Sequence, residues 1–398
     1  MNTYNVSELK AGMKFTSPLY IEGDTLFVPK MVPIKQREID RLKKWNITTV
    51  YGEGEPYDPE SAEASGSNNI LDAVFESEDY RKIISFYKDL SERMAGIYGA
   101  IRRRERITTD TIDQVVDGLN GELRVRRDEL VQYILYGLQG ESSFEQNALN
   151  SAALSILIAR QMSMTEHKIL ELATAALTHD IGMLRLPEEV VNKSGQLTGE
   201  ELQQIKTHPI HSYKILVREL GYPDAIGQAA LQHQERWDGT GYPRGLKGQK
   251  IAMHARIIAV ADAFEAMISK RPYRDSMIGY RAMRTILGDN GRRFDPEILK
   301  VFIRTMGLYP LGSVVLLNNS AVGRVIAVNE SAPLRPKVKI MIDETGSWAK
   351  DDSGDTIDLS KEKQLFIVRA IDPKDLRSDP NAQSNPNAQS QKGSGTGQ

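Results

Sequence analysis

The chain has 398 residues, 40% hydrophobic and 26% charged, a composition typical of a globular protein with several domains. Its 51 Lys and Arg against 53 Asp and Glu give a formal net charge of -2, so bulk charge favours neither a nucleic-acid polymer nor a membrane surface as partner. Cysteine is absent, which excludes disulfides, thiolate catalysis and Cys-ligated metals. With no signal-peptide pattern and no apolar run near the roughly 20 residues of a membrane helix, we expect a cytoplasmic protein.

The first 56 residues predict a small α+β module. Short strand-like runs alternate with one helical segment, in which Ile39, Leu42 and Trp45 recur at helical spacing. The runs are residues 13–20, 25–28 and 48–51. Residues 57–69 are polar, rich in Gly, Pro and Ser, and without periodicity, so we expect a linker there.

A helical pattern follows over residues 70–138 and contains a basic cluster, Arg102, Arg103, Arg104 and Arg106. Glu105 interrupts this cluster and no aromatic residues interleave with it. We therefore interpret it as a solvated helix face, with nucleic-acid binding as the alternative. We also expect these helices to mediate a homodimer.

Residues 139–308 predict an all-helical domain, which makes the whole chain mainly α. Several of its segments are apolar on more than one face, as in buried helices, and Thr198 and Glu201 form a capping box. Residues 309–371 change to period-two alternation and predict a small β extension. The tail, 372–398, holds two near copies of a hexapeptide, DPNAQS and NPNAQS, and cannot bury enough apolar surface to fold.

Histidines and carboxylates gather within the predicted helical domain. Four of the six histidines, His179, His208, His211 and His233, fall close together in the sequence, and Asp180 directly follows His179. Asp262 also stands among apolar neighbours. Buried imidazoles and carboxylates are costly unless they are hydrogen-bonded or neutralised by a cation, so the set favours a metal site over independent polar residues of the core.

Imidazole and carboxylate ligands without sulfur suit Fe, Mn, Co, Ni or Zn. An Asp adjacent to a His can bridge two ions, and paired metals are typical of phosphate-ester hydrolysis. Arg271, Arg274 and Arg244 are candidates to bind the phosphates, with ordinary surface arginines as the alternative. The loop 235–248 is rich in glycine, and its Trp237 and Tyr242 either stack on a base, close over the pocket or pack on the core.

The chain resembles the HD-GYP family, HD-type metal phosphohydrolases known as bacterial cyclic di-GMP phosphodiesterases. The resemblance rests on long motifs over residues 141–307: THDIGMLRLPEEVVNKSGQLTGEELQQIKTHPIHSYKIL, HQERWDGTGYPRGLKGQKI, ARIIAVADAFEAMISKRPYR and FDPEIL. It implies an HD-type fold, a site with one or two Fe or Mn ions, a cyclic dinucleotide substrate and partners in signalling.

Carried over by position, the resemblance makes His179, Asp180, His208, His233 and Asp262 metal ligands. Asp180 and Tyr242 become the catalytic candidates. Substrate binding falls to Tyr242 with its neighbours Gly241 and Pro243, and to Arg271 and Arg274. His211, His167 and His254 are expected outside the metal site.

Three positions depart from the family pattern. Asn147 stands where the family has its first metal-binding histidine, Gln234 where it has the second of a histidine pair, and Met183 where it has the lysine of the HDIGK motif. An amide oxygen is a poorer ligand than imidazole for these metals, and the missing lysine removes a cation near the scissile phosphate. The sequence thus predicts a metal-dependent cyclic di-GMP phosphodiesterase; the alternative is a catalytically degenerate domain that binds a nucleotide or a partner protein.

Overall fold

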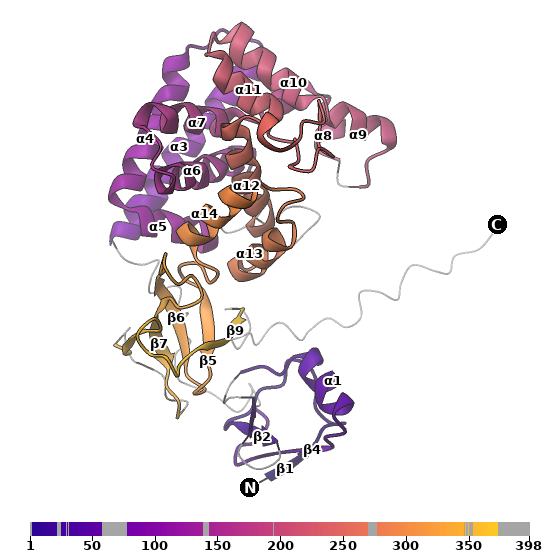
Figure 1. Cartoon of the computed structure of the whole chain (residues 1–398), viewed down its shortest axis with the longest axis vertical. Helices are drawn as coiled ribbons and strands as arrows, with labels where there is room; N and C mark the ends of the chain where they lie inside the picture. The colour runs from indigo at the N-terminus through magenta and orange to yellow at the C-terminus, as the bar shows by residue number, and fades with distance from the viewer. Residues whose placement is uncertain are drawn as a thin grey trace, which may run out of the picture.

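The computed structural model describes residues 2–21, 25–28, 30, 32–57, 78–137, 143–193, 195–269, 277–345, 347, 349 and 353–372. In Figure 1 helices α3 to α14 occupy one end of the molecule, and the C-terminal strands lie between them and the N-terminal module. The predicted linker from residue 58 onward, the start of the predicted helical segment, Arg271, Arg274 and the tail after Asp372 lie outside the described residues.

The N-terminal module is a four-stranded antiparallel sheet with one helix, α1 (Gln36–Lys44). Its strands, in the order β1-β4-β2-β3, are β1 (Asn2–Asn5), β2 (Leu19–Ile21), β3 (Thr25–Val28) and β4 (Thr49–Gly52). Ile39 and Leu42 are buried as the helical spacing predicts, but Trp45 is exposed because it follows the last turn of α1. Most of the predicted strand 13–20 is irregular, and the sequence analysis missed β1.

The helical part is built around α6 (Phe144–Gln161), which is buried from Ala148 to Ala159. It packs against α7 and α12, as expected for a helix that is apolar on all faces. The other helices are α3 (Glu78–Arg102), α4 (Thr109–Val125), α5 (Arg127–Gln132), η2 (Tyr133–Gly137), α7 (Glu166–Thr178), η3 (Ile181–Arg185), α8 (Glu188–Val191), α9 (Gly199–Ile205), α10 (His208–Tyr213), η4 (Lys214–Glu219), α11 (Asp224–Gln232), η5 (Gly248–Lys250), α12 (Met253–Ile268), α13 (Gly279–Gly288) and α14 (Pro296–Met306).

Helices α3, α4 and α5 share one hydrophobic core with the helices that follow them. A buried polar chain reinforces this packing: the Tyr87 hydroxyl of α3 donates to Asn150 of α6, whose amide donates to Glu265 of α12 over 3.3 Å. Ser269, just after α12, donates to the same Glu265 oxygen over 2.5 Å. The predicted helical segment and the predicted helical domain are therefore packed as one body.

The basic cluster does not lie on a helix face. Helix α3 ends at Arg102, and Arg104 adopts a left-handed conformation with φ of 58°. Arg103 pairs with Glu105 through hydrogen bonds of 2.6 and 2.9 Å, and Arg102 pairs with Glu188 at 3.0 Å. The sequence interpretation was wrong about the helix for the residues after Arg102, but the arginines of the cluster are exposed to solvent as it expected.

The C-terminal strands form an antiparallel sheet in the order β8-β7-β6-β5-β9. They are β5 (Val314–Leu317), β6 (Val322–Ala327), β7 (Lys337–Ile342), β8 (Thr356–Asp358) and β9 (Ile367–Ile371). All of β5 is buried because its two faces meet different cores. Val314 and Leu316 pack with the N-terminal module, while Val315 and Leu317 pack on the opposite face.

Candidate metal centre

His179 and Asp180 lie where two helices meet. His179 follows the last residue of α7, and Asp180 immediately precedes the short helix η3. Gly182 fixes this junction against α10, because its N–H donates to the Ser212 hydroxyl over 2.9 Å. A Cβ atom on Gly182 would lie 2.1 Å from the His208 carbonyl oxygen, so only glycine permits this approach.

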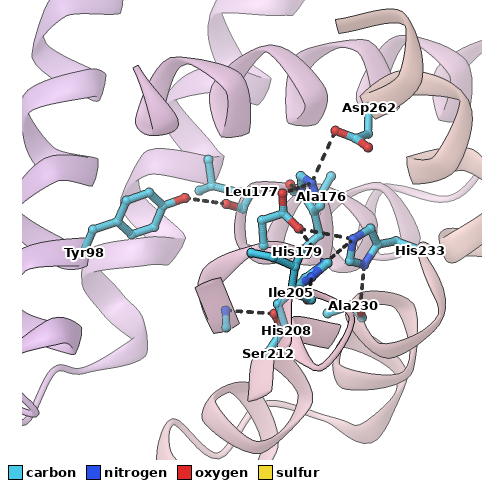
Figure 2. Close-up of polar contacts among 12 residues, drawn as sticks. Tyr98, Ala176, Leu177, His179, Ile205, His208, Ser212, Ala230, His233 and Asp262 are labelled. Atoms are coloured by element: carbon cyan, nitrogen blue, oxygen red, sulfur yellow. Dashed lines mark hydrogen bonds and ion pairs between the residues drawn. The ribbon is translucent and has the colours of Figure 1, made fainter. Parts of the chain in front are cut away.

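The rings of His179, His208 and His233 lie close together (Figure 2), and each has its Nε2 atom within 3.5 Å of the Asp180 carboxylate. Asp180 Oδ1 lies 3.1 Å from His208 Nε2 and 3.2 Å from His233 Nε2, and the two nitrogens are 3.2 Å apart. His179 Nε2 lies 3.5 Å from Asp180 Oδ2. All three histidines are buried, with at most 3% of their surface exposed. The structure thus brings together residues that are separated in the sequence.

Asp262 completes the group from the opposite side. It is carried by α12, and its Oδ1 lies 3.6 Å from His179 Nε2. Asp262 is therefore close enough to the His179–Asp180 pair to belong to the same metal site, as the sequence analysis expects. The ligand atoms of His179, Asp180 and His233 all lie within 4.8 Å of one another, close enough to hold one ion.

The outer nitrogen of each ring is fixed by a carbonyl group three residues earlier in the chain. The Nδ1 atoms of His179, His208 and His233 lie 2.7 Å from backbone oxygens, which belong to Ala176, Ile205 and Ala230. Each of these carbonyls belongs to the last turn of a helix, where a carbonyl group lacks an intrahelical partner. A carbonyl oxygen can only accept, so Nδ1 carries a hydrogen in all three rings, and Nε2 is the atom that can offer a lone pair to a cation.

This arrangement fits a cation. The Nε2 lone pairs point toward the Asp180 carboxylate and toward each other, which is repulsive without a positive charge between them. His179 Nε2 and Asp180 Oδ1 are buried and have no hydrogen-bond partner among the described residues. Imidazole nitrogens oriented by a backbone acceptor, together with carboxylates, are the donor set that Fe, Mn or Zn sites use.

The electrostatics of the group are dominated by the two carboxylates. Burial disfavours the charged form of His179, but Asp180 and Asp262 outweigh it and raise the pKa of His179 well above its usual value. Burial likewise opposes ionisation of Asp180, yet His179 and His208 hold the pKa of Asp180 well below its usual value. Burial lowers the pKa of His233, and Asp180 offsets this only in part. Two ionised carboxylates thus face the three histidines.

A glycine-rich loop places Tyr242 beside the centre. The Tyr242 ring is edge-on to His208, with centroids 6.3 Å apart, and the Tyr242–Pro243 peptide bond is cis. Gly241 is required here, because a Cβ atom would lie 2.3 Å from the Arg236 nitrogen. Burial raises the pKa of Tyr242, with smaller contributions from Asp180 and Asp262.

The loop is held by a buried carboxylate that the sequence analysis did not single out. Glu235, 3% exposed, accepts hydrogen bonds from the N–H groups of Arg244 and Leu246 over 2.7 and 2.9 Å. The feature of the sequence that could have identified Glu235 is its position two residues after His233. Trp237 lies under the Arg256 guanidinium, 5.8 Å from the ring centroid, and is half-buried.

The three positions that depart from the family pattern are all half-buried. Asn147 is the one with an unused ligand atom, since its Oδ1 is buried without a hydrogen-bond partner among the described residues. The carbonyl of Gln234 accepts the Tyr242 N–H over 3.2 Å, and Met183 lies in η3. His211, His167 and His254 take no part in the cluster.

Comparison with known proteins agrees with this geometry. Residues 135–298 match the model of the HD domain, and residues 314–379 match that of the KOW domain associated with HD domain. No helix in the described parts of the chain is long and apolar enough to span a membrane.

The chain is 27% identical over 326 residues to the cyclic di-GMP phosphodiesterase PdeB of Borreliella burgdorferi, covering 82% of this chain and 84% of that protein. It is 30% identical over 239 residues to a cyclic di-GMP phosphodiesterase of Pseudomonas aeruginosa, covering 60% and 57%. A solved HDG"Y"P protein from Bdellovibrio bacteriovorus aligns with a TM-score of 0.45 and 16% identity, covering 76% of this chain and 97% of that one. The matches thus identify an HD domain over residues 135–298, and the chain is similar to a cyclic di-GMP phosphodiesterase over 82% of its length.

Proposed function

We propose that this protein is a metal-dependent phosphodiesterase that hydrolyses a cyclic dinucleotide, most directly cyclic di-GMP. The observation that carries the proposal is the convergence of three Nε2 atoms on Asp180, with each ring fixed by a carbonyl group. The choice of substrate follows the names of the relatives from Borreliella and Pseudomonas.

The residues that would hold the metal are His179, Asp180, His208, His233 and Asp262, with Asp180 as the bridging ligand. Asn147 Oδ1 is a further candidate ligand, since it is buried and unpartnered among the described residues. Fe and Mn, as one or two ions, suit this mixture of imidazole and carboxylate. A bound divalent ion supplies Lewis acidity and a water that ionises near neutral pH.

The chain itself orients the reactants. The carbonyls of Ala176, Ile205 and Ala230 keep the three Nε2 atoms directed inward. A tyrosine hydroxyl is protonated at neutral pH, and burial raises the pKa of Tyr242 further, so this group can donate a hydrogen bond to a phosphate oxygen. Gly241 and Pro243, the neighbours of Tyr242, are proposed to bind substrate with it, and Arg271 and Arg274 are proposed to bind phosphate.

The proposal also covers the location of the protein in the cell and its partners. A cytoplasmic location is expected from the absence of cysteine. Signalling proteins are the expected partners, and a homodimer through the helices of residues 70–138 stays a prediction.

The decisive experiment measures metal content and hydrolysis together. Purified protein loaded with Mn²⁺ or Fe²⁺ should retain metal after desalting and convert cyclic di-GMP to a linear product, measured by mass spectrometry of metals and by chromatography. Asp262→Asn should lose both properties, because it removes an anionic ligand. Asp289→Asn is the matched control, since Asp289 pairs with Arg292 away from the cluster.

Two results would contradict the proposal in different ways. Protein that retains no metal under any loading condition would exclude the metal centre. Protein that retains metal and binds cyclic di-GMP without turnover would favour the degenerate binding domain, the alternative to which Met183 and Gln234 point.

A further inference from the structure

Lys206 presents its ammonium group beside the candidate metal centre. Its Nζ lies over the face of the Tyr242 ring, 5.7 Å from the centroid. The Tyr242 ring in turn lies 6.3 Å from the His208 ring. The Tyr242 ring therefore links the Lys206 ammonium group with His208, a histidine of the candidate metal centre.

The backbone around Lys206 is firmly held. Lys206 follows the last residue of α9, and its N–H donates to the Leu202 carbonyl over 3.0 Å. The first turn of α9 is fixed by the capping box between Thr198 and Glu201 that the sequence predicts. His208 lies only two residues further on, so the positions of Lys206 and the centre are coupled through the chain.

The charge of Lys206 is not neutralised by an acidic side chain. The side chain is half-buried, yet among the described residues no carboxylate oxygen lies within 4.0 Å of its Nζ. Lys193, which precedes α9, shows the contrast: both Glu201 oxygens contact its Nζ, at 2.7 and 2.8 Å. An aromatic face orients an ammonium group without cancelling its charge, so Lys206 stays available for an external anion.

A second cation, Arg293, is bound through its backbone to the loop that carries Tyr242. Its carbonyl accepts the Trp237 N–H over 3.1 Å, which ties it to the glycine-rich loop. Its guanidinium lies 5.1 Å from the centroid of the Phe294 ring, again with no carboxylate within 4.0 Å in the described part of the chain. The positive charge of Arg293 acts to lower the pKa of Tyr242, although burial and the carboxylates outweigh it.

We propose that Lys206, assisted by Arg293, binds a phosphodiester group of the cyclic dinucleotide next to Tyr242; this inference rests on the proposed function. A cyclic dinucleotide carries two phosphodiesters, each with one negative charge. Only one of them can be attacked at the metal centre at a time, so the other needs cations of its own. Lys206 would supply one of these charges, in addition to Arg271 and Arg274, the arginines proposed above to bind phosphate.

The test compares Lys206→Met, which keeps the length of the side chain, with Lys206→Arg, which keeps the charge. In Lys206→Met the KM for cyclic di-GMP should rise about 10-fold or more, because a charge-assisted hydrogen bond is lost. Metal content and kcat should change little, and Lys206→Arg should restore most of the affinity. Lys300→Met, at an exposed position on α14, should leave every parameter unchanged. If the wild type binds without turnover, the dissociation constant replaces KM.

The outcomes separate the inference from the function it rests on. Wild-type protein that neither binds nor hydrolyses a cyclic dinucleotide would overturn both. Wild-type activity with an unchanged KM in Lys206→Met would overturn the inference alone. Loss of metal in Lys206→Met, or failure of Lys206→Arg to restore affinity, would show a structural role for Lys206 and also overturn the inference.

Discussion

At the scale of single residues, each histidine ring of the candidate metal centre is held by a backbone carbonyl group. Three positions, Asn147, Gln234 and Met183, depart from the family pattern. The substitution at position 147 has a structural consequence, because the Asn147 Oδ1 atom is buried and has no hydrogen-bond partner among the described residues. A histidine at that position would offer an imidazole nitrogen instead of a weaker amide oxygen. Met183 adds no charge, whereas a lysine there would stabilise developing negative charge.

We therefore expect the triple variant Asn147→His, Gln234→His and Met183→Lys to bind more metal and to hydrolyse cyclic di-GMP faster, by about 10²-fold if the missing cation limits the rate. Single variants should give smaller gains, because groups that act as one site are not additive. Metal analysis and steady-state kinetics measure both effects.

The converse outcome is equally informative. A wild type with a full metal complement and an unaltered triple variant would show that other residues compensate for the three substitutions. A restored variant that binds metal but stays inert would show that the pocket itself has diverged, in favour of the binding alternative.

At the scale of elements, α3 contacts the segment that carries the His179–Asp180 pair. The Tyr98 hydroxyl donates to the Leu177 carbonyl over 3.3 Å, just before His179. Arg185, in η3, donates to the Ile101 carbonyl at the end of α3 over 3.0 Å and pairs with Glu219 at 2.7 Å. A displacement of α3 would therefore also move the segment that carries His179 and Asp180, because these hydrogen bonds connect the two directly.

Arg185→Met should lower the free energy of unfolding by about 0.5–1.5 kcal/mol, because it removes the hydrogen bond from Arg185 to the Ile101 carbonyl, which then keeps only the Arg104 N–H as a donor. Chemical denaturation measures this effect. Arg218→Met is the matched control, since Arg218 is exposed on the neighbouring η4 and should change stability by at most about 0.5 kcal/mol. Equal stability of the two variants would contradict a structural role for the Arg185 contact.

At the scale of the whole molecule, the N-terminal module and the C-terminal sheet share a hydrophobic core. Arg369 of β9 adds polar contacts to this interface, with its guanidinium 3.4 Å from the Pro33 carbonyl oxygen and 3.8 Å from Glu38 Oε1. The module is thus bound to the C-terminal sheet at the end of the molecule away from the helices (Figure 1). Strand β9 contributes to both cores of the sheet through Ala370 and Ile371.

Truncation experiments test this architecture. Removal of residues 373–398 should leave the Tm unchanged, because the composition of that tail cannot form a core. Removal of all residues after Gln364 also deletes β9, and should lower the Tm by about 5 °C or more because β5 loses one of its two strand partners and becomes the edge of the sheet. A similar Tm for the two truncations, measured by calorimetry, would contradict the assignment of β9 to the folded core.

The sequence by itself determined the chemistry of the site and much of the local structure. The residue types at His179, Asp180, His208, His233 and Asp262 restrict the ligand chemistry, and the capping box at Thr198 marks the start of α9 as predicted. Period-two alternation likewise locates the C-terminal strands. These features depend on side-chain chemistry and on hydrogen bonds between near neighbours, which are encoded within a few residues of the chain.

Only the tertiary structure decided how these parts meet. The carbonyl that fixes each histidine ring lies three residues away, but the direction of Nε2 toward Asp180 depends on how α7, α10 and α11 pack. The same packing brings Lys206 to Tyr242 and buries Asn147 Oδ1. It also unites α3 and α4 with the helices that follow, where the sequence suggested a separate segment. Contacts between residues far apart in the chain follow from the shape of the shared core, which no local pattern of residues specifies.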